Sequence, residues 1–98
     1  MPTRITQFDD DLNRRTILRV NGEMFIDDAK LVGRIAEQIT DEKQGVVVVD
    51  LADLDLLDGD AASELLRLKA AGRIDVAGID EFVQTAIDRA EGRGIHTT

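Results

Sequence analysis

The sequence predicts an α/β fold, in which a small mixed β-sheet carries about three helices mainly on one of its faces. After an N-terminal hairpin, predicted strands and helices alternate in the order β-β-α-β-α-β-α, which is typical of α/β sheets. Parallel strands joined through single helices take right-handed crossovers, so successive helices cover the same face. Residues 46–49 are four consecutive valines, as expected for a strand in the middle of a sheet. The 98 residues have the length of one domain.

The hairpin comes first. Residues 5–8 and, more strongly, residues 16–20 have the composition of strands, and the acidic and polar residues 9–14 between them favour a turn. Residues 21–24 follow as a second predicted turn. Gly22 is its candidate for a positive φ angle, because glycine adopts that conformation without steric cost.

The first helix follows this turn. Asp27 or Asp28 is placed to cap its N-terminus, and Gly45 to stop its C-terminus. Its apolar positions follow helical spacing: Leu31, Val32, Ile35, Ala36 and Ile39. Phe25 and Ile26, just before the helix, either plug the edge of the core or face a partner, and we favour the core.

The second half of the chain starts after the valines. Residues 50–60 mix acids with leucines and form a loop, and residues 61–71 form a helix that directs Leu65, Leu66 and Leu68 inward. Residues 73–77 alternate as a short strand. Residues 79–90 carry the cleanest apolar stripe of the chain and predict the third helix.

Composition excludes several classes of function. Twenty Asp and Glu against twelve Lys and Arg give a net charge of −8, which opposes binding to nucleic acid or to an anionic membrane. The three aromatic residues are all Phe and offer no platform for stacking bases. There is no Cys and only one His, His96, so thiolate chemistry, His-based triads and multi-His metal sites are excluded.

No apolar run approaches the roughly 20 residues of a membrane helix, so we predict no membrane insertion. The N-terminus lacks the apolar stretch of a signal peptide. Both observations lead us to expect a soluble, cytoplasmic protein.

The acid-rich loop allows several interpretations. Counted from Asp53, acids occupy the first, third and twelfth positions of a calcium loop, but Asp58 stands at the sixth, where glycine is required. Paired carboxylates for acid–base catalysis need an apolar pocket and a chemical partner, and no Ser, Lys or His is near enough in sequence to provide one. A helix cap by Asp58 or Asp60 is favoured over both. The remaining possibility is a recognition surface.

Three segments, taken in their order along the chain, resemble the sequence pattern of one protein family. Residues 20–24 (VNGEM), residues 46–51 (VVVVDL) and residues 56–60 (LLDGD) are similar to the STAS domain of sulfate transporters and anti-sigma-factor antagonists. The resemblance covers about residues 13–91 and depends on the joint order and spacing of the segments. It implies a single STAS-like domain over residues 1–98, with a frayed tail over 92–98.

The resemblance implies a protein-interaction domain with no catalysis, catalytic residues, cofactor or metal of its own. Family members that regulate sigma factors bind a kinase-like anti-sigma factor through this loop, and that partner phosphorylates a Ser or Thr there. In this chain the acceptor position is Gly59, which has no hydroxyl, and Asp60 beside it carries a permanent charge. Ser63, the only serine, is a weaker candidate phosphorylation site. The implied partner-binding residues are Asp58, Gly59 and Asp60, joined by Asp27 and Asp28 on a neighbouring loop.

Two other functions stay open. A shorter branch of the family supplies the small cytoplasmic subunit of phospholipid-trafficking ABC transporters, where the partner would be the ATPase. The third possibility is a domain that binds a small ligand or a metal ion. The absence of a hydroxyl at Gly59 leaves three interpretations of the loop: constitutive binding, a permanently set state, or a lost switch.

Overall fold

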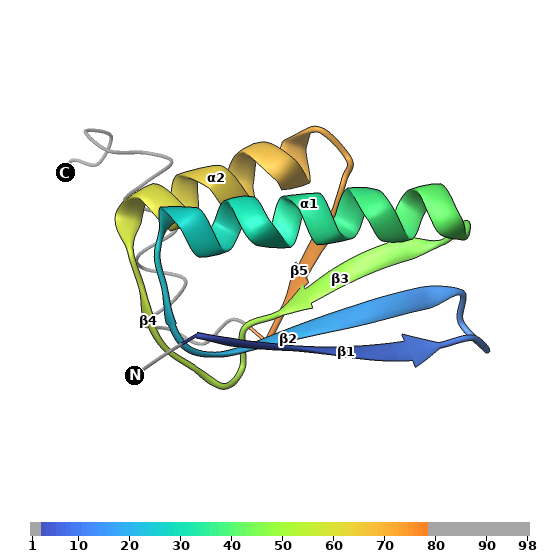
Figure 1. The fold of residues 1–98 in the computed structure, drawn as a ribbon, viewed down its shortest axis with the longest axis horizontal. Coiled ribbons are helices and arrows are strands. Elements are labelled where there is room, and N and C mark those ends of the chain that lie inside the picture. Colours follow the sequence, from blue (N-terminus) through green and yellow to red (C-terminus); the bar gives the residue numbers. More distant parts are fainter. Residues whose placement is uncertain (1–2, 79–98) are drawn as a thin grey trace, which may run out of the picture.

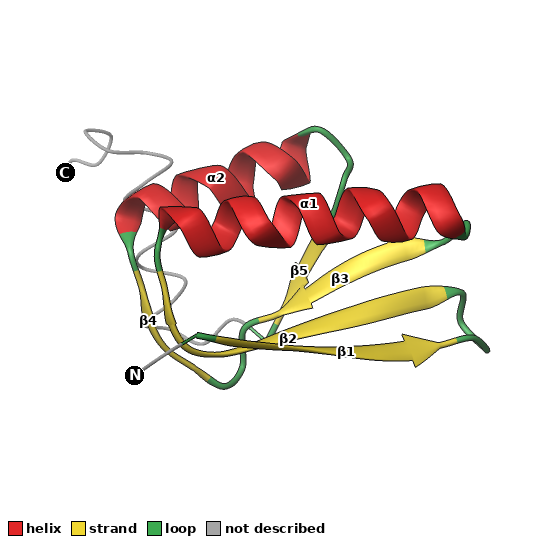
Figure 2. Ribbon diagram, in the orientation of Figure 1, coloured by secondary structure: helices red, strands yellow, loops and turns green. Residues whose placement is uncertain are grey.

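A five-stranded mixed sheet and two helices make up residues 3–78, the part of the chain that this computed structural model describes. Figures 1 and 2 show the two helices lying side by side on the same face of the sheet. The elements in chain order are β1 (Arg4–Asp10), β2 (Arg15–Met24), α1 (Ile26–Glu42), β3 (Val46–Asp50), β4 (Leu54–Leu57), α2 (Gly59–Ala70) and β5 (Asp75–Ala77).

The sheet has the strand order β1-β2-β3-β5, and β4 pairs with the end of β2. β1 and β2 form the antiparallel hairpin, whereas β2, β3 and β5 run parallel. The predicted mixed sheet, with a hairpin, parallel strands and helices on one face, is confirmed. The third predicted helix, over residues 79–90, and the tail over residues 92–98 lie outside the described residues.

β2 continues through the segment that the sequence predicted as a turn. Gly22 has the expected positive φ, 90°, but it lies in a strand, where the register with β4 shifts between Gly22 and Glu23. A positive φ at a glycine is a common way to bulge a strand and bend it. The first part of β2 therefore pairs with β3 and its last part with β4. The prediction of a turn at residues 21–24 was wrong.

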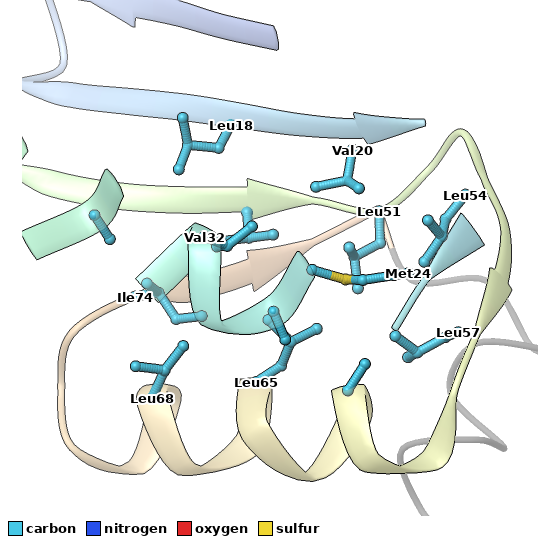
Figure 3. Packing of buried hydrophobic residues seen from close by; sticks show 14 of the residues in the cluster. Leu18, Val20, Met24, Val32, Leu51, Leu54, Leu57, Leu65, Leu68 and Ile74 are labelled. Atoms are coloured by element: carbon cyan, nitrogen blue, oxygen red, sulfur yellow. The ribbon is translucent and has the colours of Figure 1, made fainter. Parts of the chain in front are cut away.

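The core lies between the sheet and the two helices, as Figure 3 shows. Its largest fully buried side chains are Leu18, Val20, Met24, Val32, Val47, Val49, Leu51 and Leu65. In α2, Leu65 and Leu68 are buried as expected, but Leu66 is only partly buried. β3 is central in the sheet, yet its valines alternate between buried and more exposed, and Val46 is 47% exposed. The run of valines predicted a strand buried on both faces. Within the described residues, one face of β3 is instead partly exposed.

The turn of the hairpin is held by Asp10. Its carboxylate accepts hydrogen bonds from the Asn13 side-chain amide (2.9 Å) and from Arg15 Nε (3.0 Å). The hydrogen bond from Asn13, with the smaller effect of Arg15, lowers the pKa of Asp10 below its usual value. Because the folded-state pKa is depressed, this group stabilises the fold at neutral pH, and its contribution is lost as the pH falls through the folded-state pKa.

We expect the free energy of unfolding to decrease as the pH is lowered below about 4, the ordinary pKa of an aspartate. Asp10→Asn should make this decrease smaller, because the variant lacks the shifted group. Urea unfolding followed by circular dichroism at a series of pH values measures the effect. Asp11→Asn is the control, since the Asp11 side chain makes no hydrogen bond or ion pair within residues 3–78. An equal change in both variants would contradict the assignment.

Candidate functional site

The pairing of β2 with β4 brings the beginnings of the two helices together. Met24 is opposite Leu57 in the parallel register, and the Asp58 N–H donates to the Met24 carbonyl (2.9 Å). Since α1 and α2 start directly after these two strand ends, they begin at the same end of the molecule (Figure 1). We call the residues gathered there the helix-start surface: Phe25, Asp27, Asp28, Asp58, Gly59 and Asp60.

Asp58 is the N-cap of α2. Its backbone is extended (φ −68°, ψ 147°), and its side chain accepts a hydrogen bond from the Asp60 N–H (3.1 Å). Asp60 lies in the first turn and is exposed. Both carboxylates lie at the positive end of the helix dipole, which favours negative charge. The predicted cap is confirmed, although α2 begins at Gly59, two residues earlier than the sequence suggested.

Gly59 has room for a side chain. A Cβ atom built there meets no other atom within 4 Å, and its φ is not in the left-handed region. The residue is exposed at the start of α2. Packing therefore does not require glycine at this position, and a serine would be accommodated. The lack of a hydroxyl is a property of the sequence rather than a demand of the fold.

At the start of α1 the capping arrangement differs from the prediction. The N-cap is Phe25, and neither Asp27 nor Asp28 holds that position. Instead Asp28, in the first turn, accepts hydrogen bonds from the Phe25 N–H (2.9 Å) and from Thr3 Oγ1 (3.0 Å). Asp28 is thus half-buried and structurally engaged, whereas Asp27 is exposed. Both acids lie in the first turn of α1, which begins beside the start of α2.

Phe25 corrects a second expectation. Its side chain is 44% exposed and does not plug the core, while Ile26 is half-buried. The β2–β4 pairing fixes its place, because Phe25 follows Met24 as Asp58 follows Leu57. An exposed aromatic side chain among carboxylates is the kind of residue that anchors protein contacts. The apolar pair Phe25-Ile26 was visible in the sequence, but the exposure of Phe25 is seen only in the structure.

Two other acids of residues 50–60, Asp50 and Asp53, make contacts outside the helix-start surface. Asp50 accepts hydrogen bonds from the Ala52 N–H (3.0 Å) and Arg19 Nε (3.4 Å), and Arg19 Nε is also 3.9 Å from Asp53 Oδ2. Leu54 and Leu57 are buried, because this segment is strand β4 rather than the expected loop. The calcium-loop interpretation is incompatible with that backbone. Within residues 3–78, no three His, Asp or Glu side chains are grouped to hold a metal ion.

Ser63, the weaker phosphorylation candidate, is exposed on α2. Of three hollows on the described surface, only the one between β1 and α1 reaches the helix-start surface, where it includes Asp28. The first hollow lies near the turn at Gly45, and the second includes Gly45 and extends to Arg73. The third lies between β1 and α1 and includes Ile5 and Ile35. None of these three includes a residue of α2's first turn. Neither described helix is long and apolar enough to cross a membrane.

Comparisons with known proteins agree with this geometry at the level of fold. No family model matches the sequence, and no curated protein sequence matches it at a significant level. Among solved structures, it is similar to a STAS-domain antisigma-factor antagonist from Rhodobacter sphaeroides. The TM-score is 0.57 at 18% sequence identity, over 78% of this chain and 86% of the other. The described residues therefore have the fold of a STAS domain, as the three sequence segments indicated.

Proposed function

We propose that the protein is a non-enzymatic, cytoplasmic interaction domain that binds a protein partner through the helix-start surface. The observation that carries this proposal is the meeting of two helix starts, each with two aspartates, around the exposed Phe25. The structural neighbour is by its description an antisigma-factor antagonist, which favours an anti-sigma factor as the partner class.

The charges of this surface favour a basic partner. Four of the chain's 20 acidic residues are gathered there: Asp27, Asp28, Asp58 and Asp60. Complementary charge on a partner mainly increases the association rate and selects against wrong partners. Phe25 supplies the apolar contact area that charge alone lacks, and buried aromatic residues dominate the energy of many interfaces.

The negative charge at the start of α2 is fixed. Phosphorylation in related switches adds nearly two negative charges at such a place. In this chain the position has no acceptor, because it is Gly59, while the exposed residue beside it is the acid Asp60. We therefore infer that binding is constitutive with respect to phosphorylation at this loop.

A comparison of variants tests the proposal. The tagged protein and its Phe25→Ala and Asp60→Lys variants are used as baits, and captured proteins are quantified by mass spectrometry. We expect both variants to lose the same specific partner at least about tenfold, the loss typical of interface residues that contribute more than about 1.4 kcal/mol. A kinase-like anti-sigma factor among the lost proteins supports the proposed partner class, whereas an ABC ATPase identifies the transporter-subunit alternative.

The matched control is Asp41→Lys, which makes the same charge change in the last turns of α1, on an exposed side chain. It should retain the partner. Circular dichroism checks that all variants fold, since a lysine at position 60 opposes the α2 dipole by about 0.5 kcal/mol. If every specific partner is retained equally by Phe25→Ala, Asp60→Lys and Asp41→Lys, the helix-start surface is not the binding site.

A further inference from the structure

The outer edge of β1 is the only long strand edge in residues 3–78 that lacks a strand partner. β1 has seven residues, Arg4–Asp10, paired on its inner side with β2 in an unbroken register. β5, at the other edge, has three residues. Natural proteins usually protect long edges with proline, a bulge or central charged residues, because an open edge invites pairing with another chain. β1 has none of these in its middle, where the sequence is Ile5 to Phe8.

The charges at the two ends of β1 are arranged so that β1 strands of two copies of the chain can pair. Arg4 and Asp10 lie three residues before and three residues after Gln7. In an antiparallel pair of two β1 strands centred on Gln7, each Arg4 is directly opposite Asp10 of the second copy. Opposite charges that face one another across antiparallel strands stabilise the pair, and like charges destabilise it.

Both charged groups have capacity for such a contact. Arg4 is exposed and makes no ion pair within the described residues. Asp10 uses Oδ2 for Asn13 and Arg15, whereas Oδ1 accepts only one long hydrogen bond, 3.4 Å from the Asn13 N–H. A carboxylate has about four acceptor sites. Asp10 is therefore able to accept a hydrogen bond from Arg4 of a second copy and to keep its hydrogen bonds to Asn13 and Arg15.

The position of Phe8 also favours this pairing of two β1 strands. Phe8 is opposite Ile17 in the hairpin, on the sheet face away from the helices, and is 44% exposed. The Arg19 guanidinium lies 5.1 Å from the centre of its ring. In the pairing centred on Gln7, Phe8 is opposite Thr6 of the second copy, and the two Phe8 rings become diagonal neighbours across the two-fold axis. Diagonal positions are within reach of aromatic side chains, so the pairing buries this exposed ring.

We propose that two copies of this chain form a two-fold dimer by antiparallel pairing of β1 with β1, centred on Gln7. The dimer has one continuous sheet through both copies. A two-fold interface of this kind uses the same patch on both subunits, as the self-complementary charges require. This contact lies on the sheet edge and not on the helix-start surface, so its test is independent of the proposed function.

Charge reversal tests the pairing, with the oligomeric state read by sedimentation velocity over a concentration series. We expect the unmodified protein to dimerise, and Arg4→Glu and Asp10→Arg each to weaken the dimer at least about tenfold, since each variant places like charges opposite one another twice. Mixing the two variants should restore a dimer that contains one copy of each. Arg34→Glu, the same charge change on an exposed residue of α1, should dimerise as the unmodified protein does.

Circular dichroism of each variant separates loss of pairing from loss of folding. The mixing arm serves the same purpose, because a misfolded variant does not regain a partner. The proposal is overturned if the unmodified protein is a monomer throughout the series. It is also overturned if a dimer persists unchanged in Arg4→Glu and Asp10→Arg, which would place the contact on another surface.

Discussion

Gly45→Ala is expected to destabilise the protein by about 2–4 kcal/mol, a large part of the total stability of a small domain. Gly45 has φ 143°, which side chains rarely adopt, and an added Cβ would overlap the Arg14 carbonyl oxygen. That oxygen accepts the Val46 N–H (3.1 Å), the hydrogen bond at the start of the β2–β3 pairing. The substitution therefore strains the backbone and displaces a partner of the central strand.

Gly59→Ala is the matched control. It makes the same chemical change at a glycine with an ordinary φ and no neighbour within 4 Å of the new atom. We expect no loss, or a gain of about 0.5 kcal/mol, because alanine restricts the unfolded chain and favours the helix. Urea unfolding followed by circular dichroism measures both variants. Equal stabilities would show that the close approach of Gly45 to Arg14 has no energetic consequence.

Gly45 also shows where reasoning from sequence reached the right residue for the wrong reason. The glycine was predicted to stop the first helix, but α1 ends at Glu42 and its C-cap is Lys43. The positive φ instead serves the turn into β3, where the chain passes close to Arg14. A sequence pattern indicates that a glycine needs its freedom, but it does not show which distant backbone atom lies beside it.

Periodicity predicted the long elements well, because burial on one face imposes a pattern on their sequences. α1, α2, β3 and the hairpin were all expected near their observed positions. The strand β4 was missed, since Leu54–Leu57 has only four residues and its Asp55 resembles the loop acids around it. A strand this short is defined by its partner, the end of β2, and that pairing depends on the bulge at Gly22.

The candidate site was therefore predictable in part. Asp58, Asp60, Asp27 and Asp28 were identified from local cap chemistry and from the resemblance, which both depend on nearby residues. The exposure of Phe25 was not predicted, because an apolar pair before a helix fits a core position as well as an exposed one. The pairing of Met24 with Leu57, residues far apart in sequence, brings the two helix starts together.

Met24 is the side chain on which this arrangement depends. It is fully buried in the core between the sheet and the helices (Figure 3), and its carbonyl accepts the Asp58 N–H (2.9 Å). We expect Met24→Ala to cost about 2–4 kcal/mol, from lost apolar burial and the cavity that remains. The substitution should also loosen the positions of Phe25 and Asp58, which directly follow the ends of β2 and β4.

Met24→Leu keeps nearly the same volume and should cost less than about 1.5 kcal/mol, so it separates filling the space from the identity of the residue. Leu12→Ala is the second control, because Leu12 is 92% exposed and its truncation leaves no cavity. Urea unfolding ranks the three variants, and amide hydrogen exchange at Phe25 and Asp58 reports on the helix starts. If Met24→Ala is as stable as Leu12→Ala and exchange at both sites is unchanged, the β2–β4 junction does not hold the helix-start surface together. The residues of the helix-start surface would then be positioned by the packing of the two helices alone, in which Leu68 of α2 lies directly against Gly33 of α1 and leaves no free space for a larger side chain there.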